Sequence, residues 1–282
     1  MNFSNIANLS RKEKKVAGEI DKYRNLYSSI KLIEYYEPAV ITLIDDTKKT
    51  DKMAVIVSEP DDINCWIHGL SQSCVVKMKN LEDSIISLIN NGDLYSAAIL
   101  IRHHMELVGL ICLSLEVLQE QDYEKLQRFI SKTFYGAAYY NNPRLRRSED
   151  ASFRTETPTV SAMIRALDNL LKQNSDNEFE ENVFTHNYAF LCQFSHPCYD
   201  TSSFFVNTIK INEGHMIQFR WQPDYGKTGL FTTLNALKQN LQFGLASFYL
   251  FTAYHFTHEK IFVNEANIAI SYEILSGKKA EE

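Results

Sequence analysis

The amino-acid sequence predicts an all-α protein, a helical bundle with a small β-hairpin inserted near residues 203–222. The 282 residues include only 10 glycines and 6 prolines, and many are leucine, isoleucine, alanine and glutamate. This composition favours long helices over a sandwich or barrel. Residues 203–211 and 215–221 are instead rich in β-branched and aromatic side chains. The intervening Asn212-Glu213-Gly214 is typical of a hairpin connection.

Four helices are predicted in the N-terminal half, at residues 10–36, 61–90, 94–118 and 122–140. Ser10 and Glu13 have the spacing of a capping box, which marks the start of the first helix. Asn90-Asn91-Gly92 is a stop signal, and Asp93 is positioned to cap the third helix. Between the first two helices, residues 53–57 fit either a short strand or a helical turn.

Three more helices are predicted in the C-terminal half, at residues 158–173, 178–195 and 227–260. Thr157-Pro158 has the pattern of an N-cap followed by the first helical residue. Residues 144–157 are charged and lack periodicity, so we expect a mobile loop there. We expect an N-terminal helical region at residues 1–60 and a main helical domain, with the hairpin, at residues 61–282.

Composition also limits the classes of function. The net charge of −6 argues against a protein that coats nucleic acid, because such binding depends on neutralising phosphates. The five cysteines form no CxxC pair, which is typical of reduced thiols in a cytosolic protein. The N-terminal residues lack the apolar segment of a secretion signal. We therefore predict a cytoplasmic protein that does not span a membrane and needs no metal or cofactor.

The third predicted helix, residues 94–118, is apolar on nearly every face and should be buried. It nevertheless contains Arg102 and Glu106, four residues apart and therefore on one face. A buried charge without a partner is costly, so we expect the two to form a buried pair. The pair could serve as a structural ion pair that fixes helix register, or it could form the polar floor of a cleft.

Histidines supply the other candidate residues. His103 and His104 follow Arg102 and point to other sides of the helix, so at least one should face a neighbouring element. His196 follows Ser195 at a predicted helix end, where the helix dipole favours a protonated imidazole. Each histidine also has a structural interpretation, as a packed or surface residue or as a helix C-cap.

RHHMEL within an apolar helix, followed by a helix that ends in FSHP, resembles the uncharacterised bacterial DUF5677-type family over roughly residues 60–210. The helical arrangement is also similar to HEPN domains, which are common in toxin–antitoxin and phage-defence ribonucleases. The resemblance implies a metal-independent ribonuclease with Arg102, Glu106 and His196 as catalytic residues and RNA as substrate. We also expect His103, His104, Ser195 and Tyr139 to bind the ligand.

This sequence departs from the HEPN pattern, in which four to six residues separate an arginine from the following histidine on one helix. His103 and His104 are too close to Arg102, so His196 would have to come from another helix. The competing hypothesis is a non-catalytic helical module that binds a small ligand, a protein partner or a second copy of the chain. A zinc site at Cys192, His196 and Cys198 is disfavoured because no fourth ligand has regular spacing.

Overall fold

The structure, a computed structural model, describes residues 9–28, 30, 41–43, 53–55, 63–120, 125, 129, 133, 158–174, 182–196, 206–211, 214–219 and 226–256. Its helices are α1 (Arg11–Ser28), α2 (Ile63–Asn90), α3 (Leu94–Gln119), α6 (Val160–Asn174), α7 (Val183–Ser195) and α9 (Gly226–Phe256). Its strands are β1 (Ile41–Leu43), β2 (Met53–Val55), β3 (Val206–Ile211) and β4 (Gly214–Phe219). The prediction of a mostly helical fold with a hairpin is confirmed.

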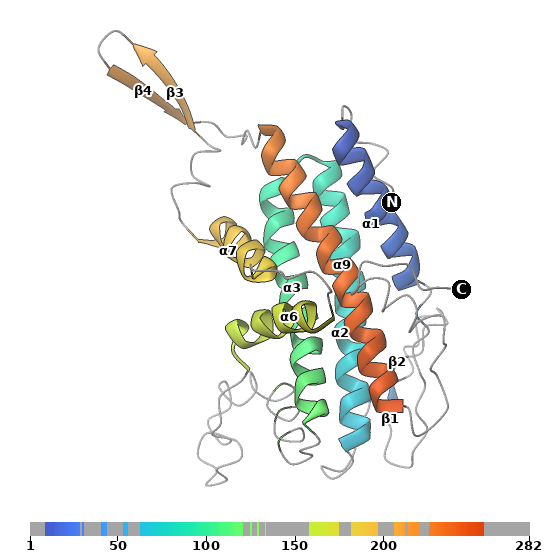
Figure 1. Cartoon of the computed structure of the whole chain (residues 1–282). Coiled ribbons are helices and arrows are strands. Elements are labelled where there is room, and N and C mark those ends of the chain that lie inside the picture. Colours follow the sequence, from blue (N-terminus) through green and yellow to red (C-terminus); the bar gives the residue numbers. More distant parts are fainter. Residues whose placement is uncertain are drawn as a thin grey trace.

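The long helices α1, α2, α3 and α9 run roughly lengthwise, while α6 and α7 lie against one flank of α3 (Figure 1). The helix α3 packs against α2, α6, α7 and α9, so it is the central element of the bundle. The β3–β4 hairpin projects beyond the end of the bundle. Residues of α1 share one hydrophobic core with α2, α3 and α9.

Local signals set the start of α1 and the boundary between α2 and α3 as the sequence indicates, whereas α1 ends at Ser28 and not at the predicted residue 36. The Ser10 backbone N–H donates to Glu13 Oε2 at 2.7 Å and the Glu13 N–H donates to Ser10 Oγ at 3.3 Å, so the predicted capping box is confirmed. Asp93 Oδ1 accepts from the Ser96 N–H at 3.0 Å, which caps α3. Before it, Gly92 has a φ of 78°, a left-handed conformation that favours glycine.

The start of α6 differs from the prediction. This helix begins at Val160, and the Thr159 hydroxyl accepts from the Ala162 N–H at 3.2 Å. Thr159 therefore supplies the N-terminal cap that the sequence suggested for Thr157. Both threonines satisfy the residue preference for a cap, so only the path of the backbone distinguishes them.

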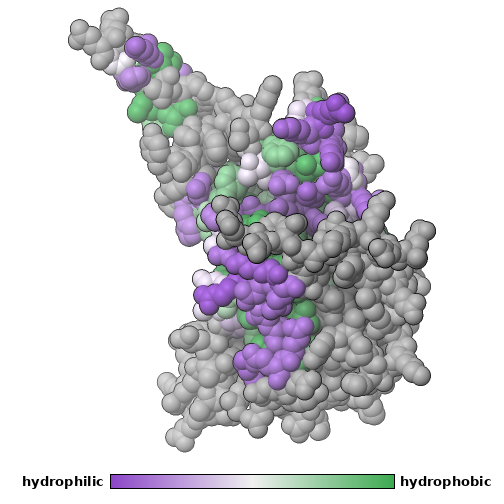
Figure 2. All heavy atoms as spheres, viewed as in Figure 1, coloured by the Kyte–Doolittle hydropathy of each residue, from purple (hydrophilic) through white to green (hydrophobic). Residues whose placement is uncertain are grey.

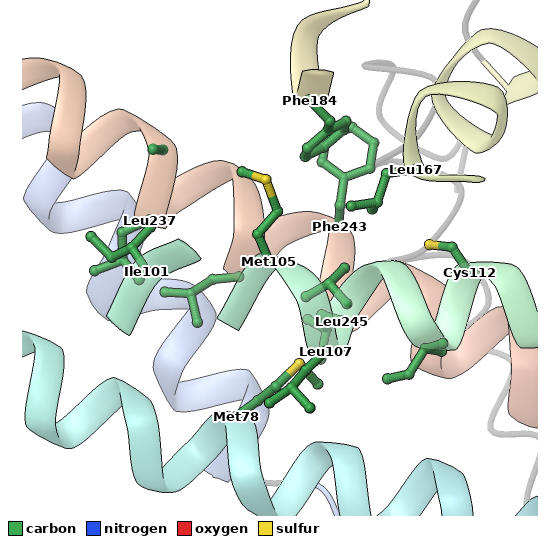
Figure 3. Packing of buried hydrophobic residues seen from close by; sticks show 14 of the residues in the cluster. Met78, Ile101, Met105, Leu107, Cys112, Leu167, Phe184, Leu237, Phe243 and Leu245 are labelled. Carbon is green, nitrogen blue, oxygen red and sulfur yellow. The ribbon is translucent and has the colours of Figure 1, made fainter. Parts of the chain in front are cut away.

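The core is formed by apolar side chains from every long helix (Figure 3). Ile101 and Met105 of α3 are completely buried, as are Met78 of α2 and Leu237 of α9. By length and composition α3 is apolar enough to cross a membrane, but 67% of that apolar window is buried within the protein. A core helix has the same properties, so α3 is here the centre around which the other helices pack.

An aspartate on α6 holds the start of α7. Asp168 is 3% exposed and accepts from the backbone N–H groups of Phe184 and Thr185 at 2.8 and 3.1 Å. It also accepts from the Thr185 hydroxyl at 2.7 Å. The residue at the N-cap position, Asn182, makes no capping bond with its own side chain. A carboxylate from a neighbouring helix therefore accepts hydrogen bonds from N–H groups in the first turn of α7, and its negative charge interacts favourably with the helix dipole.

The strands form two separate antiparallel pairs, β1 with β2 and β3 with β4. The ambiguous segment at residues 53–57 contributes β2, and its partner β1 was not predicted. The predicted hairpin is confirmed, with continuous register from Val206 opposite Phe219 to Ile211 opposite Gly214. The predicted loop at residues 144–157 lies outside the described residues, as does most of the predicted helix at residues 122–140.

Close contact between α3 and α6 depends on Gly109. A Cβ atom at this position would lie 2.8 Å from the Met163 carbonyl oxygen, a contact that only a backbone shift can relieve. We predict that Gly109→Ala lowers the free energy of unfolding by about 1–3 kcal/mol, as overpacking does in other cores. Urea denaturation measures this change.

The matched control is Gly18→Ala in α1, where a Cβ atom meets nothing within 4 Å. Alanine is the better helix former, so this variant should gain about 0.5–1 kcal/mol. Equal stability of the two variants would show that α3 and α6 do not approach each other at Gly109.

Candidate functional site

Arg102 and Glu106 form an ion pair on the face of α3 that α7 covers. Arg102 Nε lies 3.2 Å from Glu106 Oε1, so the predicted pairing is confirmed. The side chains are 24% and 21% exposed, so the pair is only partly buried and not buried as predicted. The reason is their place in the fold, because they lie where α7 crosses α3 and solvent reaches the edge of the contact.

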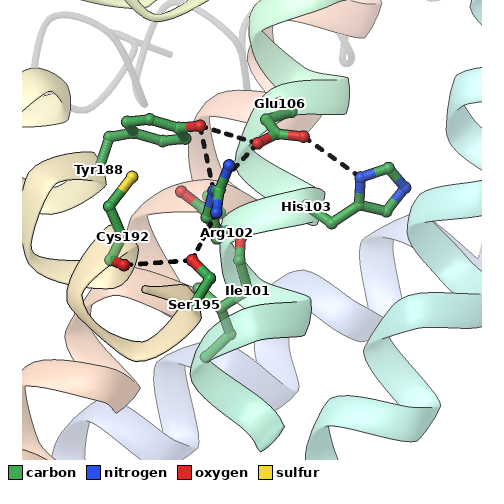
Figure 4. A network of polar contacts seen from close by, with 8 residues as sticks. Ile101, Arg102, His103, Glu106, Tyr188, Cys192 and Ser195 are labelled. Atoms are coloured by element: carbon green, nitrogen blue, oxygen red, sulfur yellow. Dashed lines mark hydrogen bonds and ion pairs between the residues drawn. The ribbon is translucent and has the colours of Figure 1, made fainter. Parts of the chain in front are cut away.

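Two side chains from α7 complete this polar cluster (Figure 4). The Tyr188 hydroxyl accepts from Arg102 Nε at 3.0 Å and donates to Glu106 Oε1 at 2.9 Å. Arg102 Nη1 donates to Ser195 Oγ, which in turn donates to the Cys192 carbonyl oxygen at 3.2 Å. The guanidinium also lies over the Tyr188 ring, 5.3 Å from its centroid, in a cation–π contact. We call Arg102, Glu106, Tyr188 and Ser195 the Arg102 cluster.

One histidine contacts the Arg102 cluster, and a second follows it in the chain at the end of α7. His103 is 54% exposed, and its Nδ1 lies 3.4 Å from Glu106 Oε2. Glu106 thus contacts Arg102 with one oxygen and His103 with the other. His196 is the exposed C-cap of α7, and its backbone N–H donates to the Cys192 carbonyl oxygen at 3.1 Å. Its neighbour Ser195 contacts Arg102, so the end of α7 adjoins the cluster.

Contacts within the Arg102 cluster determine which of its side chains are ionised at neutral pH. Burial raises the pKa of Glu106, but hydrogen bonds from His103 and Tyr188 and the charge of Arg102 outweigh burial, so the net pKa is lowered. Burial raises the pKa of Tyr188 well above its ordinary value, and the neighbouring Glu106 carboxylate raises it further. At neutral pH the cluster therefore holds an ionised Glu106, a neutral tyrosine and a charged guanidinium.

His104 belongs to a different polar contact. It is completely buried between α3 and α2, and its Nε2 lies 4.0 Å from Glu82 Oε1. Glu82 is 3% exposed, and burial raises its pKa despite the neighbouring His104 and Arg24. Arg24 of α1 lies 3.9 Å from the other Glu82 oxygen. These contacts connect α1 and α2 to α3. Because His104 is completely buried, its ring does not reach solvent.

Tyr139 lies outside the described residues, as does Cys198. Within the described ranges, no group of three or more His, Cys, Asp or Glu side chains could hold a metal ion. Tyr188, which bridges Arg102 and Glu106, was not a predicted site residue. Tyr188 precedes Ser195 by seven residues, so both lie on one face of α7. This spacing is the sequence signal that could have identified Tyr188 as a site residue.

No family model, curated protein or solved structure matches this chain. The resemblance of RHHMEL and FSHP to the DUF5677-type family therefore stays a hypothesis.

Because the pKa of Glu106 is lowered, the contribution of this side chain to the free energy of unfolding should depend on pH. A carboxyl group whose folded pKa lies below its ordinary value of 4.5 stabilises the fold above that pH, and the stabilisation is lost as pH falls through the folded pKa. Glu106→Gln should therefore cost about 1–2 kcal/mol near neutral pH, typical of lost charged hydrogen bonds. The difference from wild type should shrink below pH 4.5.

Urea denaturation of both proteins over a pH series measures this difference. Glu120→Gln is the control, since its side chain is 50% exposed and contacts only the exposed Lys125 among the residues of the described structure. Surface pairs contribute about 0–1 kcal/mol, so its effect should be small at every pH. A Glu106→Gln difference that does not vary with pH would contradict the lowered pKa.

Proposed function

We propose that the protein is a HEPN-like defence or toxin-type effector whose Arg102 cluster acts on RNA as a metal-independent ribonuclease. The supporting observation is that Arg102, partly exposed, is held where α7 packs against α3, that Glu106 joins it to the exposed His103, and that the exposed His196 directly follows its partner Ser195. A guanidinium that stays charged can neutralise a phosphate, and imidazole is the side chain suited to proton transfer near neutral pH. RNA cleavage without a metal needs both capabilities.

The proposed cleavage of RNA uses two histidines and Arg102. A histidine removes the proton from the ribose 2′-hydroxyl, whose oxygen attacks the adjacent phosphorus. The bond from phosphorus to the 5′-oxygen breaks, and a second histidine protonates that oxygen. The products are a 2′,3′-cyclic phosphate and a free 5′-hydroxyl. Arg102 would neutralise the charge that develops on the phosphate oxygens.

His103 is the better candidate for the base. Its Nδ1 faces Glu106 Oε2 at 3.4 Å, an arrangement in which a carboxylate orients the ring and leaves Nε2 directed away from that carboxylate. His196 is the candidate for the second proton-transfer group, because it adjoins Ser195 at the exposed end of α7. Glu106 and Tyr188 would be positioning residues, since they hold Arg102 rather than the substrate.

One observation favours a second function, a non-catalytic module that binds a protein partner or small ligand. Glu106 already neutralises Arg102 and would repel a phosphate placed directly between them. A ligand with its own hydrogen-bond donors would avoid that repulsion. The two hypotheses differ in whether RNA is cleaved.

The test is RNA integrity and growth arrest on expression, with cleavage of a labelled RNA by purified protein. We predict cleavage by wild type in the presence of a chelator. Arg102→Ala and His196→Ala should each lower the rate at least about 100-fold, the usual contribution of charge neutralisation or proton transfer. Circular dichroism should show that both variants remain folded.

Two variants serve as matched controls. His186→Ala removes an exposed histidine at the other end of α7, whose ring nitrogen contacts only the Asn182 carbonyl oxygen among the described residues. Arg165→Ala removes an exposed arginine of α6. Both should cleave at the wild-type rate. Absence of cleavage by wild type would reject the ribonuclease in favour of the binding module.

A further inference from the structure

The β3–β4 hairpin carries an unusual apolar surface. The large hydrophobic side chains exposed within the described part of the chain are all on this hairpin: Ile209 at 39%, Met216 at 44%, Ile217 at 62% and Phe219 at 79%. Every residue of β4 is exposed. Figure 2 shows the hydrophobic residues of the hairpin at the tip of the molecule, away from the bundle. An isolated two-stranded hairpin is at best marginally stable in water, so this hairpin should gain stability from a partner.

The outer edge of β4 lacks the features that normally prevent strand pairing. Exposed edges are usually protected by charged side chains, proline or a bulge. The sequence of β4, GHMIQF, contains no proline and no formally charged residue, and its register with β3 is continuous. By contrast, Lys210 lies on β3. Within the described part of the chain, the edge of β4 is therefore the one open to another strand.

Strand geometry indicates which residues of β4 offer free backbone groups. The paired residues Ile211 and Gly214 are separated by two residues, and in such hairpins the pair next to the connection is hydrogen-bonded. Hydrogen-bonded pairs alternate along the ladder, so Met216 and Gln218 direct their backbone groups to β3. The backbone groups of His215, Ile217 and Phe219 then point to the open edge.

We propose that β4 pairs with β4 of a second copy of this chain, antiparallel about a twofold axis at Ile217. This pairing places Ile217 opposite Ile217 of the second copy, and His215 opposite Phe219. All three positions with outward backbone groups then meet positions of the same kind, which a symmetric contact requires. Because β4 carries no formal charge, the two copies bring no like charges together along the new contact.

The same register brings Ile217 and Phe219 of the two copies onto one face of the joined sheet. Residues opposite each other in a ladder point to the same face, and alternate residues along a strand share it. Ile217 and Phe219 therefore lie on one face with Val206, the partner of Phe219 on β3. Pairing about Ile217 joins this face to its copy in one four-stranded sheet, so the two most exposed hydrophobic side chains of the described residues pack laterally against side chains of the second copy.

The proposal is tested by the mass of the full-length chain in solution, from sedimentation equilibrium over a concentration series. Wild type should be a dimer. Ile217→Lys and Ile217→Glu should each be monomeric, since each places two like charges at the twofold axis. An equimolar mixture of the two should restore a dimer, because opposite charges then meet.

Met216→Lys is the matched control, since Met216 is an exposed apolar residue of the same strand that points to the other face. It should remain dimeric. That result would show that dimer formation depends on the position of Ile217 and not on exposed hydrophobic side chains in general. A monomeric wild type would overturn the proposal and leave the edge for a strand of a different protein. So would a dimer that survives both Ile217 substitutions, or a mixture that stays monomeric. The test is independent of ribonuclease activity.

Discussion

The burial of α3 on several sides is the constraint on which the rest of the structure depends. Four helices pack against it, and its apolar residues fill the centre of the core. A helix so enclosed can carry ionisable side chains only where a neighbouring helix supplies partners for them. Glu82 of α2 faces His104 on one side, and Tyr188 and Ser195 of α7 face Arg102 on another.

The position of α7 therefore decides whether the Arg102 cluster exists. Asp168 of α6 binds the first N–H groups of α7, and Phe184 at that end is completely buried against Phe243 of α9. The other end of α7 brings Ser195 to Arg102. One end of the helix is thus fixed by capping and packing, while the other end carries the polar contacts and the exposed His196. Such an arrangement supports a site on rigid elements with one side open to solvent.

Much of the fold could be predicted because it depends on local signals. The Ser10–Glu13 capping box, the Asp93 cap and the Gly92 turn fix helix ends through residues a few positions apart. The Arg102–Glu106 pair follows from spacing on one helix. Contacts between distant segments could not be predicted. Asp168 caps a helix 15 residues further along the chain, and Tyr188 joins Arg102 from another helix. Such contacts depend on helix packing angles that a single sequence does not encode locally.

The most direct test of the proposed site is whether RNA contacts Arg102. The Nε–H group of Arg102 is held by Glu106 and Tyr188, so its nuclear magnetic resonance signal should be protected from rapid exchange and identifiable by its loss in Arg102→Lys. Titration with a short RNA that lacks the 2′-hydroxyl at the cleavage position keeps the ligand intact. The proposed site predicts a saturable shift of this signal. A signal that stays unchanged while RNA binds elsewhere would contradict it.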